Sequence, residues 1–261
     1  MEPLEKIALK LGHRKQEFFH FFKHYDATLS HLRSEKISFL EIGIGGSKDP
    51  KDGGHSLKIW SEYFSKASLY ALDLYYKDLK LNSRIKIFQG SQIDKKVLDN
   101  IHNVSGDFDI IIDDGSHKNS HQIETFKILF PKLKSGGYYF IEDVQTSYYL
   151  SDGGDGFYLN NKKTAINFFK TMIDRIHQVE HENPYSKPDY YSKNITEIIF
   201  VPNLIIIKKN ENKSKSHILI NNQKPIKGQS LLTLRKILKI LKYNFHYIRS
   251  KIYYLIDYFK I

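Results

Sequence analysis

The middle of this chain alternates short apolar runs with segments of helical periodicity. Five runs of strand length are rich in Ile, Leu, Phe and Tyr, and amphipathic segments separate most of them. The apolar runs cover residues 37–42, 68–73, 84–88, 108–114 and 136–144. Strands that alternate with helices predict a mostly parallel sheet with helices on both faces, which is an α/β, Rossmann-like fold.

Two further segments complete the predicted sheet domain. A helix is predicted over residues 161–179, with an apolar face made of Ile166, Phe169, Ile173 and Ile176. Residues 196–209 then form two β-rich runs around a Pro-Asn turn, which indicates an antiparallel hairpin. A parallel sheet that ends in one antiparallel hairpin is typical of the methyltransferase variant of the Rossmann architecture rather than of the dehydrogenase variant.

The composition indicates the cellular compartment in which the protein works. A length of 261 residues suits one α/β domain with appendages, and the absence of cysteine excludes disulfides and thiolate metal sites and fits a reducing compartment. The N-terminus carries early acidic residues and no long apolar core, which is unlike a signal peptide. No stretch approaches the roughly 20 apolar residues of a membrane-spanning helix. We therefore expect a cytoplasmic protein.

The net charge of +11 is confined to the C-terminal part. Residues 207–261 hold 13 Lys or Arg against two acids, which leaves 27 of each sign in residues 1–206. Residues 230–261 form a basic amphipathic segment that can lie on an anionic membrane face, or can be a dimerising or core-capping helix with a solvated basic side. Nucleic-acid binding is disfavoured, because the motifs described below carry no extra basic residues. We predict three parts: a helical segment 1–36, a sheet domain 37–209, and a linker with basic helices 210–261.

Glycines follow the first predicted strand at once. The turn reads Glu41, Gly43, Gly45 and Gly46, and glycine there lets the backbone approach a ligand closely. A dinucleotide fingerprint requires a small residue where Lys48 stands and a helix that begins directly after it. A long loop follows instead, so a pyrophosphate would lose its helix N-terminus. NAD is therefore disfavoured, and a ligand without phosphates is favoured.

The next two strands end in residues that suit a nucleoside. Asp73 closes the second strand, where an acid accepts hydrogen bonds from two ribose hydroxyls, and the sequence GSQID, which includes Gln92, follows the third strand, where adenine commonly lies. Each feature alone is also compatible with a solvated strand end or a tight turn. Their order and even spacing predict S-adenosyl-L-methionine as the cofactor.

Four carboxylates stand at the ends of the fourth and fifth strands. Asp113 and Asp114 end one strand, Glu142 and Asp143 end the other, and neighbouring parallel strands would bring all four together. Such a cluster would repel itself, and some members would stay protonated, unless a divalent cation binds there. Hard oxygen ligands without cysteine suit Mg²⁺ or a similar cation.

His117 lies three residues after Asp114 and can take a proton near neutrality. We predict that it deprotonates an alcohol held by the metal, which then attacks a sulfonium methyl group. A lone histidine after a strand is more often a cap or a surface residue, so the prediction depends on the carboxylates beside it. His121 and His55 are ambiguous by the same criteria.

Several segments resemble a known family. They are FLEIGIGG, GGHSLKIWSEYF, LYALDLY, IKIFQGSQID, FDIIIDDGSH and GGYYFIEDVQTSYY. Together they are similar to the metal-dependent, macrolide-type sugar O-methyltransferases, whose type members are the mycinamicin and macrocin enzymes. The resemblance covers about residues 39–158, and its pair DDGSH and IEDVQTSY is specific. The cephalosporin-hydroxylase-like proteins share the second of these motifs.

The resemblance implies roles for particular residues. It implies Mg²⁺ ligands at Asp114, Glu142 and Asp143, with His117 as the base. It implies cofactor contacts at Glu41, Gly43, Asp73 and Gln92, and we also place Gly45 and Asp113 on the cofactor side. The segments TSYY and DGGDGFY would form part of the acceptor pocket. Ser91 departs from the pattern, because the family usually has an acid there. The N-terminal part is shorter than the auxiliary domain of the macrolide enzymes, so their acceptor and their assembly are not carried over.

The sequence thus predicts an S-adenosylmethionine- and Mg²⁺-dependent O-methyltransferase that acts on a sugar hydroxyl. We expect a nucleotide-linked or glycan sugar, such as a heptose or deoxyhexose of capsule or lipopolysaccharide, a homo-oligomer, and peripheral contact of the C-terminal helices with the inner membrane face. The rival hypotheses are an NAD-dependent or hydroxylase-like Rossmann enzyme, and a non-enzymatic protein that docks on membranes.

Overall fold

The structure is a computed structural model, and it describes residues 2–12, 21–181 and 186–216, with seven residues between 241 and 252. The chain divides into two units. The first comprises Met1–His177 and Pro188–Lys213, and the second comprises Gln178–Lys187 and Ser214–Ile261. The predicted basic helices of residues 230–261 lie outside the described residues apart from those seven, so their membrane or subunit contacts stay predictions. No described helix is long and apolar enough to cross a membrane.

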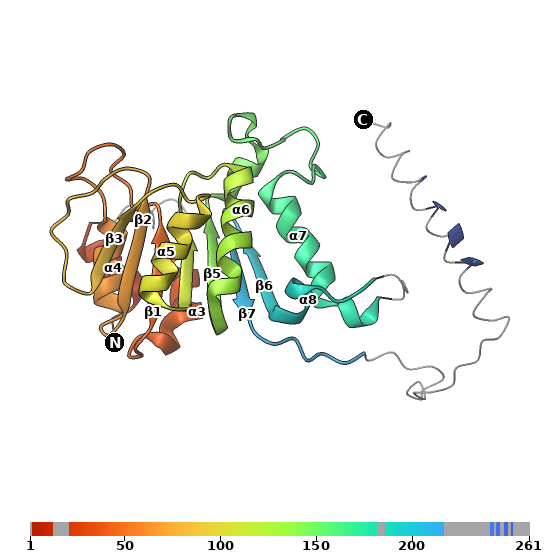
Figure 1. The fold of residues 1–261 in the computed structure, drawn as a ribbon, viewed down its shortest axis with the longest axis horizontal. Helices are drawn as coiled ribbons and strands as arrows, with labels where there is room; N and C mark the ends of the chain where they lie inside the picture. Colours follow the sequence, from red (N-terminus) through yellow and green to blue (C-terminus); the bar gives the residue numbers. More distant parts are fainter. Residues whose placement is uncertain are drawn as a thin grey trace. The chain divides into compact units, whose positions relative to one another are not determined.

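The first unit is built on a seven-stranded sheet (Figure 1). Its strands lie in the order β3-β2-β1-β4-β5-β7-β6, and β7 pairs antiparallel with both β5 and β6. Their bounds are β1 Ser38–Ile42, β2 Ser68–Asp73, β3 Ile85–Gln89, β4 Phe108–Asp113, β5 Leu133–Glu142, β6 Ile195–Val201 and β7 Leu204–Lys209. The predicted mostly parallel, Rossmann-like sheet with a C-terminal hairpin is confirmed.

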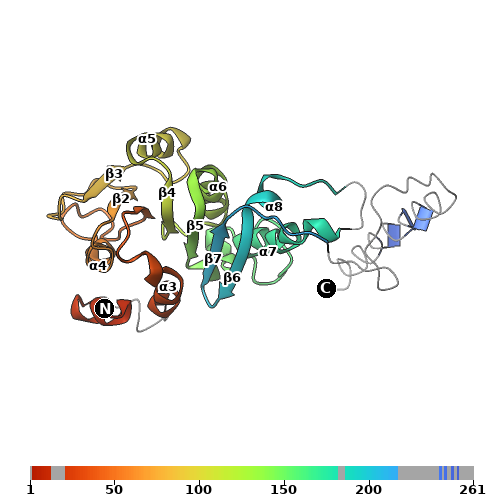
Figure 2. The same ribbon diagram turned by 90° about the horizontal axis from the view of Figure 1, so that it is seen from below.

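Helices cover both faces of this sheet. In Figure 2, α5 and α6 lie on one side, and α3 and α4 lie on the other. The described helices of the first unit are α1 Leu4–Lys10, α3 Phe21–Leu29, α4 His55–Tyr63, α5 Lys95–Ser105, α6 Asn119–Leu129, α7 Ala165–Ile176 and α8 Tyr190–Asn194. Short 3-10 helices join them: η1 Ser30–Leu32, η2 Phe130–Lys132, η3 Val144–Tyr148 and η4 Leu150–Asp152, with η5 Gln178–Glu180 in the second unit.

The side chains of the strands point alternately to the two faces of the sheet and fill a separate core on each face. Phe39, Ile110 and Phe140 pack with α1, α3 and α4 in the first core. Leu40 and Ile111 pack with α5, α6 and α7 in the second. Because side chains of a strand alternate between faces, strands buried on both faces are apolar throughout, which is what made them recognisable in the sequence. The N-terminal helices share a core with β1 and α4; the predicted domain boundaries themselves stay predictions.

The predicted apolar face of α7 needs a correction. Ile173 is 42% exposed, whereas Ala165, Phe169 and Met172 are buried. These three residues follow the i, i+4, i+7 spacing of a single helix stripe, and Phe169 packs on the Phe126 ring with centroids 5.0 Å apart. The contact with α6 therefore sets the rotation of α7: Ile166 and Ile176 pack against the second core as predicted, whereas Ile173 lies at the exposed edge of the stripe.

The order of the strands places the site. β1 pairs with β2 on one side and with β4 on the other, so the direction of winding reverses between β1 and β4. In open α/β sheets a ligand binds outside the carboxyl ends of the strands at such a reversal. Asp113 pairs with Ile42 of β1 and with Ile141 of β5, which brings the ends of these three strands to one level.

Candidate active site

The glycine turn after β1 is a tight crossing of two backbones. Gly43 has a φ of +80°, and a Cβ built on it would lie 2.1 Å from the backbone oxygen of Asp114. Gly45 also has a positive φ, +73°, but a Cβ there would meet nothing within 4 Å. The next helix, α4, begins only at His55. Two predictions are thus confirmed: the backbone of the glycine turn makes a close approach, and a long loop separates this turn from the next helix.

A cavity of about 400 Å³ lies on the β2 and β3 side of this turn. Its walls include Gly43, Gly45, Asp73, Gln92, Asp114, His117 and Asp143. The Asp73 side chain is largely buried, and its carboxylate accepts hydrogen bonds from the backbone N–H of Ile44 at 3.1 Å and of Tyr75 at 2.9 Å. The structure thus brings predicted cofactor residues and predicted catalytic residues to one hollow.

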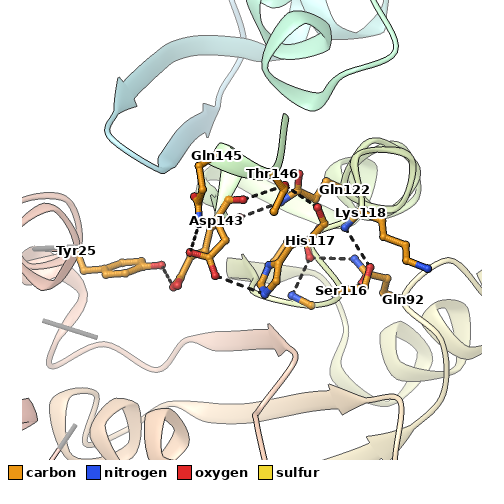
Figure 3. Close-up of polar contacts among 12 residues, drawn as sticks. Tyr25, Gln92, Ser116, His117, Lys118, Gln122, Asp143, Gln145 and Thr146 are labelled. Carbon is orange, nitrogen blue, oxygen red and sulfur yellow. Dashed lines mark hydrogen bonds and ion pairs between the residues drawn. The ribbon is translucent and has the colours of Figure 1, made fainter. Parts of the chain in front are cut away.

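Gln92 and Asp113 form the support beneath this cavity. The Gln92 amide nitrogen donates to Asp113 Oδ1 at 3.0 Å and to Thr125 Oγ1 at 3.1 Å, while its oxygen accepts from the Ser116 N–H at 2.7 Å. Asp113 is buried and does not line the cavity, and burial raises its pKa to about 7. Gln92 therefore ties β4 and the turn after it to α6. Figure 3 shows Gln92 beside Ser116 of that turn.

Three side chains on the other side of the cavity could hold a cation. Asp114, His117 and Asp143 each offer one ligand atom, and these atoms lie within 4.8 Å of one another. His117 Nε2 is 3.4 Å from Asp143 Oδ2, and Figure 3 shows the ring directed at that carboxylate. These distances show that the ends of β4 and β5 converge at these three residues, as predicted. Carboxylate and imidazole ligands suit a divalent cation.

His117 and Asp143 share an unusual backbone conformation. Their φ angles are +56° and +55°, in the left-handed region that residues other than glycine seldom adopt. Such conformations cost of order 1–3 kcal/mol each and cluster at functional sites. The Thr146 hydroxyl contacts both turns, at 2.7 Å from the His117 carbonyl and 3.0 Å from the Asp143 carbonyl. The fold therefore stabilises a strained arrangement that faces the two side chains toward each other.

Glu142 is placed differently from the other predicted ligands. It is buried, its Oε1 accepts a hydrogen bond from the Tyr25 hydroxyl at 2.5 Å, and it lies outside the group of three. It does line a second cavity of about 490 Å³ together with Asp114 and Glu41. The assignment of Glu142 as a metal ligand stays a prediction, as do the roles of the other predicted site residues.

The second cavity contains residues that the sequence did not single out. Its aromatic walls are Phe21, Phe22, Tyr25 and Trp60, and the glycine turn separates it from the first cavity. Glu41 accepts hydrogen bonds there from Ser56 Oγ at 3.0 Å and from Trp60 Nε1 at 3.3 Å. A signal did exist for Tyr25: it lies four residues after Phe21 on an apolar helical stripe, which is where a buried hydroxyl needs a partner.

Comparison with known proteins agrees with the fold. No protein-family model matches the chain. The mycinamicin VI 2''-O-methyltransferase of Micromonospora griseorubida is 38% identical over 211 residues, which are 80% of this chain and 53% of the relative. The demethylmacrocin O-methyltransferase of Streptomyces fradiae is 36% identical over 193 residues, 74% of this chain and 49% of the relative. The chain therefore spans about half the length of the curated relatives it matches.

A solved structure gives the same result. The MycE methyltransferase from the mycinamycin biosynthetic pathway, in complex with Mg and SAH, superimposes with a TM-score of 0.78 at 34% identity, over 88% of this chain and 59% of MycE. The sheet order and this match define the fold as that of the Rossmann-like methyltransferases. Within that class, sequence and structure together show that the chain is homologous to the macrolide-type sugar O-methyltransferases.

Proposed function

We propose that this protein is an S-adenosylmethionine- and Mg²⁺-dependent O-methyltransferase that acts on a sugar hydroxyl. The observation that carries the proposal is the position of Asp73, the glycine turn, Asp114 and His117 around one cavity. The relatives support it, since they are O-methyltransferases of sugars on macrolides and tetracenomycins.

The first cavity fits an adenosyl group better than a dinucleotide. Asp73 is the acid at the end of β2, in the place that suits ribose hydroxyls, and the glycine turn lets the backbone approach the ligand. No helix begins at this turn, because α4 starts at His55, so a pyrophosphate would find no N-terminal amides there. The acidic and aromatic second cavity, which also opens at Gly43 and Gly45, suits the cationic methionyl end of the cofactor.

The carboxylate side fits a hard divalent cation. Asp114 and Asp143 supply oxygens, and Glu142 lies beside Asp114 in the neighbouring cavity. When bound, Mg²⁺ would polarise the acceptor hydroxyl and S-adenosylmethionine would supply the electrophilic methyl group. The chain would then contribute orientation, because the strained turns at His117 and Asp143 aim their side chains at one point.

His117 would move the proton. Its Nε2 would accept the proton of the sugar hydroxyl, while the oxygen forms a bond to the methyl carbon and the carbon–sulfur bond breaks. The products balance as a methyl ether, S-adenosylhomocysteine and one proton on the imidazole. Asp143, at 3.4 Å from Nε2, would stabilise the resulting imidazolium.

The acceptor hydroxyl belongs to a sugar in this proposal. We infer a nucleotide-linked or glycan sugar, such as a heptose or deoxyhexose of capsule or lipopolysaccharide, handled in the cytoplasm. The basic segment of residues 230–261 supports a setting at an anionic membrane face. The segment after η3 exposes Tyr149 and Phe157, the second of them 86% exposed, which suits stacking against an acceptor. The relatives' macrolide acceptors are not carried over, because the chain spans only about half of those proteins.

A ligand titration tests the cofactor. Purified protein is titrated with S-adenosylhomocysteine and, separately, with NAD⁺, each with Mg²⁺ and then with excess chelator. We expect S-adenosylhomocysteine to bind and NAD⁺ not to bind, and we expect methyl transfer to nucleotide sugars and glycans to stop in chelator and to return with Mg²⁺. Binding of NAD⁺, or methyl transfer that persists in chelator, would contradict the proposal.

A further inference from the structure

Helix α3 contacts the carboxylate cluster through the hydroxyl of Tyr25. Tyr25 lies on α3, 117 residues away from Glu142 in sequence, and its hydroxyl donates to Glu142 Oε1 at 2.5 Å. Tyr25 is 1% exposed and Glu142 is 4% exposed, so the contact is buried. In Figure 3 a dashed line from the labelled Tyr25 hydroxyl marks this hydrogen bond.

The aromatic core fixes the ring that carries this hydroxyl. The Tyr25 ring packs against Phe140 with centroids 4.6 Å apart and against Trp60 at 5.1 Å in an edge-on arrangement. Phe140 lies on β5 two residues before Glu142, so the same strand holds both the ring and the carboxylate. The position of the hydroxyl therefore depends on how α3 docks on the sheet.

A Tyr hydroxyl carries its proton at neutral pH, so it is the donor in its contact with the Glu142 carboxylate. A neutral donor next to this carboxylate stabilises it without placing a competing cation at the site.

We propose that Tyr25 is a positioning residue that orients Glu142 beside Asp114 and so raises the affinity of the site for a divalent cation. The inference rests on the proposed function, because it takes the cation site from there. It adds that helix α3, which precedes the predicted sheet domain, completes that site. Groups that orient metal-binding side chains typically change metal affinity or activity by about 10–100-fold when they are removed.

The chain offers a matched control. The Tyr63 hydroxyl donates to Asp26 Oδ1, also at 2.5 Å, and Tyr63 is 2% exposed in the same core as Tyr25. Asp26 follows Tyr25 directly on α3, but it does not line the cavity that holds Glu142 and Asp114. The Tyr63→Phe variant therefore removes a part-buried hydroxyl–carboxylate bond of the same length from the same core without changing the cation site.

The experiment compares cation affinity in the full chain. Wild type, Tyr25→Phe and Tyr63→Phe are titrated with Mn²⁺ or Mg²⁺ by calorimetry at saturating S-adenosylhomocysteine, and the fluorescence of Trp60, the single tryptophan, gives a second readout. We expect Tyr25→Phe to weaken cation binding about 10-fold while Tyr63→Phe leaves it unchanged. Tyr25→Phe keeps the aromatic ring in the wall of the second cavity, so S-adenosylhomocysteine affinity, measured in all three proteins, should change less than cation affinity. Equal cation affinity in wild type and Tyr25→Phe, or an equal loss in both variants, would overturn the positioning role.

A third variant tests whether Tyr25 acts through Glu142. Glu142→Gln retains an oxygen that accepts from the Tyr25 hydroxyl but removes the charge, so it should fold and lose cation affinity. In a double-mutant cycle, the two changes should be non-additive if Tyr25 acts through Glu142, and additive losses would overturn the inference. A wild type that binds S-adenosylhomocysteine but no cation would instead overturn the metal dependence of the proposed function.

Discussion

On the β1 and β2 side of the sheet's carboxyl edge, the cavity wall is largely backbone, whereas on the β4 and β5 side it is made of side chains. Gly43 and Gly45 form the first wall, and Asp73 there accepts backbone N–H groups. Asp114, His117 and Asp143 form the second, and each projects a titratable group toward the others. We therefore expect ligand binding to depend on the shape of the backbone in the first half of the site and on charged side chains in the second half.

The two halves should therefore tolerate different changes. A backbone wall is sensitive to any added atom, because a Cβ at the crossing has no space. A side-chain wall is insensitive to small changes in volume, but it depends on individual oxygens and nitrogens, since a ligand atom or a proton acceptor has no substitute. The following predictions test this division, from the largest expected effect to the smallest.

Removing the imidazole of His117 should have the largest effect. We expect His117→Gln to lower the rate of methyl transfer by about 10²–10⁴-fold, as is typical for a lost general base, while S-adenosylhomocysteine affinity is retained. Steady-state kinetics and calorimetry measure the two quantities. His121→Gln is the matched control, because His121 lines the same cavity and contacts Ser116 Oγ at 2.7 Å. A similar rate loss in both variants would argue against His117 as the base.

Adding a methyl group to the glycine turn should have the second-largest effect. Gly43→Ala places a Cβ 2.1 Å from the Asp114 carbonyl oxygen, so either the turn or β4 must shift. Gly45→Ala has the same positive φ without an overlap, and it should cost only the about 1–2 kcal/mol of the left-handed conformation. We expect a clearly larger fall in the free energy of unfolding for Gly43→Ala in urea denaturation. Equal losses would mean that the crossing is not rigid.

Gln92, which lies beneath the cavity, connects the two halves of the site through its hydrogen bonds. Gln92→Met keeps the length of the side chain but removes its hydrogen bonds to Asp113, Thr125 and the Ser116 N–H. Buried polar groups left without partners cost about 1–3 kcal/mol each, so we expect a loss of stability of that size. Cofactor affinity and the rate of methyl transfer should fall together, because the turn after β4 borders both. A change in only one of them would show that the halves are independent.

The pH dependence of stability should show the smallest effect. Burial raises the pKa of Asp113 to about 7 from 3.8, so the folded state keeps a proton that the unfolded state has already released between these values. The stabilisation from this group is therefore complete below about pH 4 and is lost as the pH rises through 7. Urea midpoints in chelator should fall between pH 5 and 8 more steeply in wild type than in Asp113→Asn. Parallel pH profiles would contradict the assignment.

Much of the fold could be predicted from local pattern. Strands buried on both faces are continuous apolar runs, and the Pro-Asn turn between two β-rich runs marked the hairpin correctly. The acids at the ends of β4 and β5 could also be located, because parallel strands of a doubly wound sheet end at one edge. The rotation of α7 could not, since Ile173 and Met172 are both apolar and only contact with α6 decides which is buried.

The sequence by itself determined the sheet, the glycine turn and the set of acids that can meet a ligand. Periodicity and strand-end chemistry are local properties, and so they are readable in one chain. Only the tertiary structure decided which partner each acid has. Asp143 lies beside His117, Glu142 accepts a hydrogen bond from Tyr25, and the buried Asp113 accepts one from Gln92. These contacts join residues between 21 and 117 positions apart. They arise from the docking of α3 and α6 on the sheet, which no local pattern specifies.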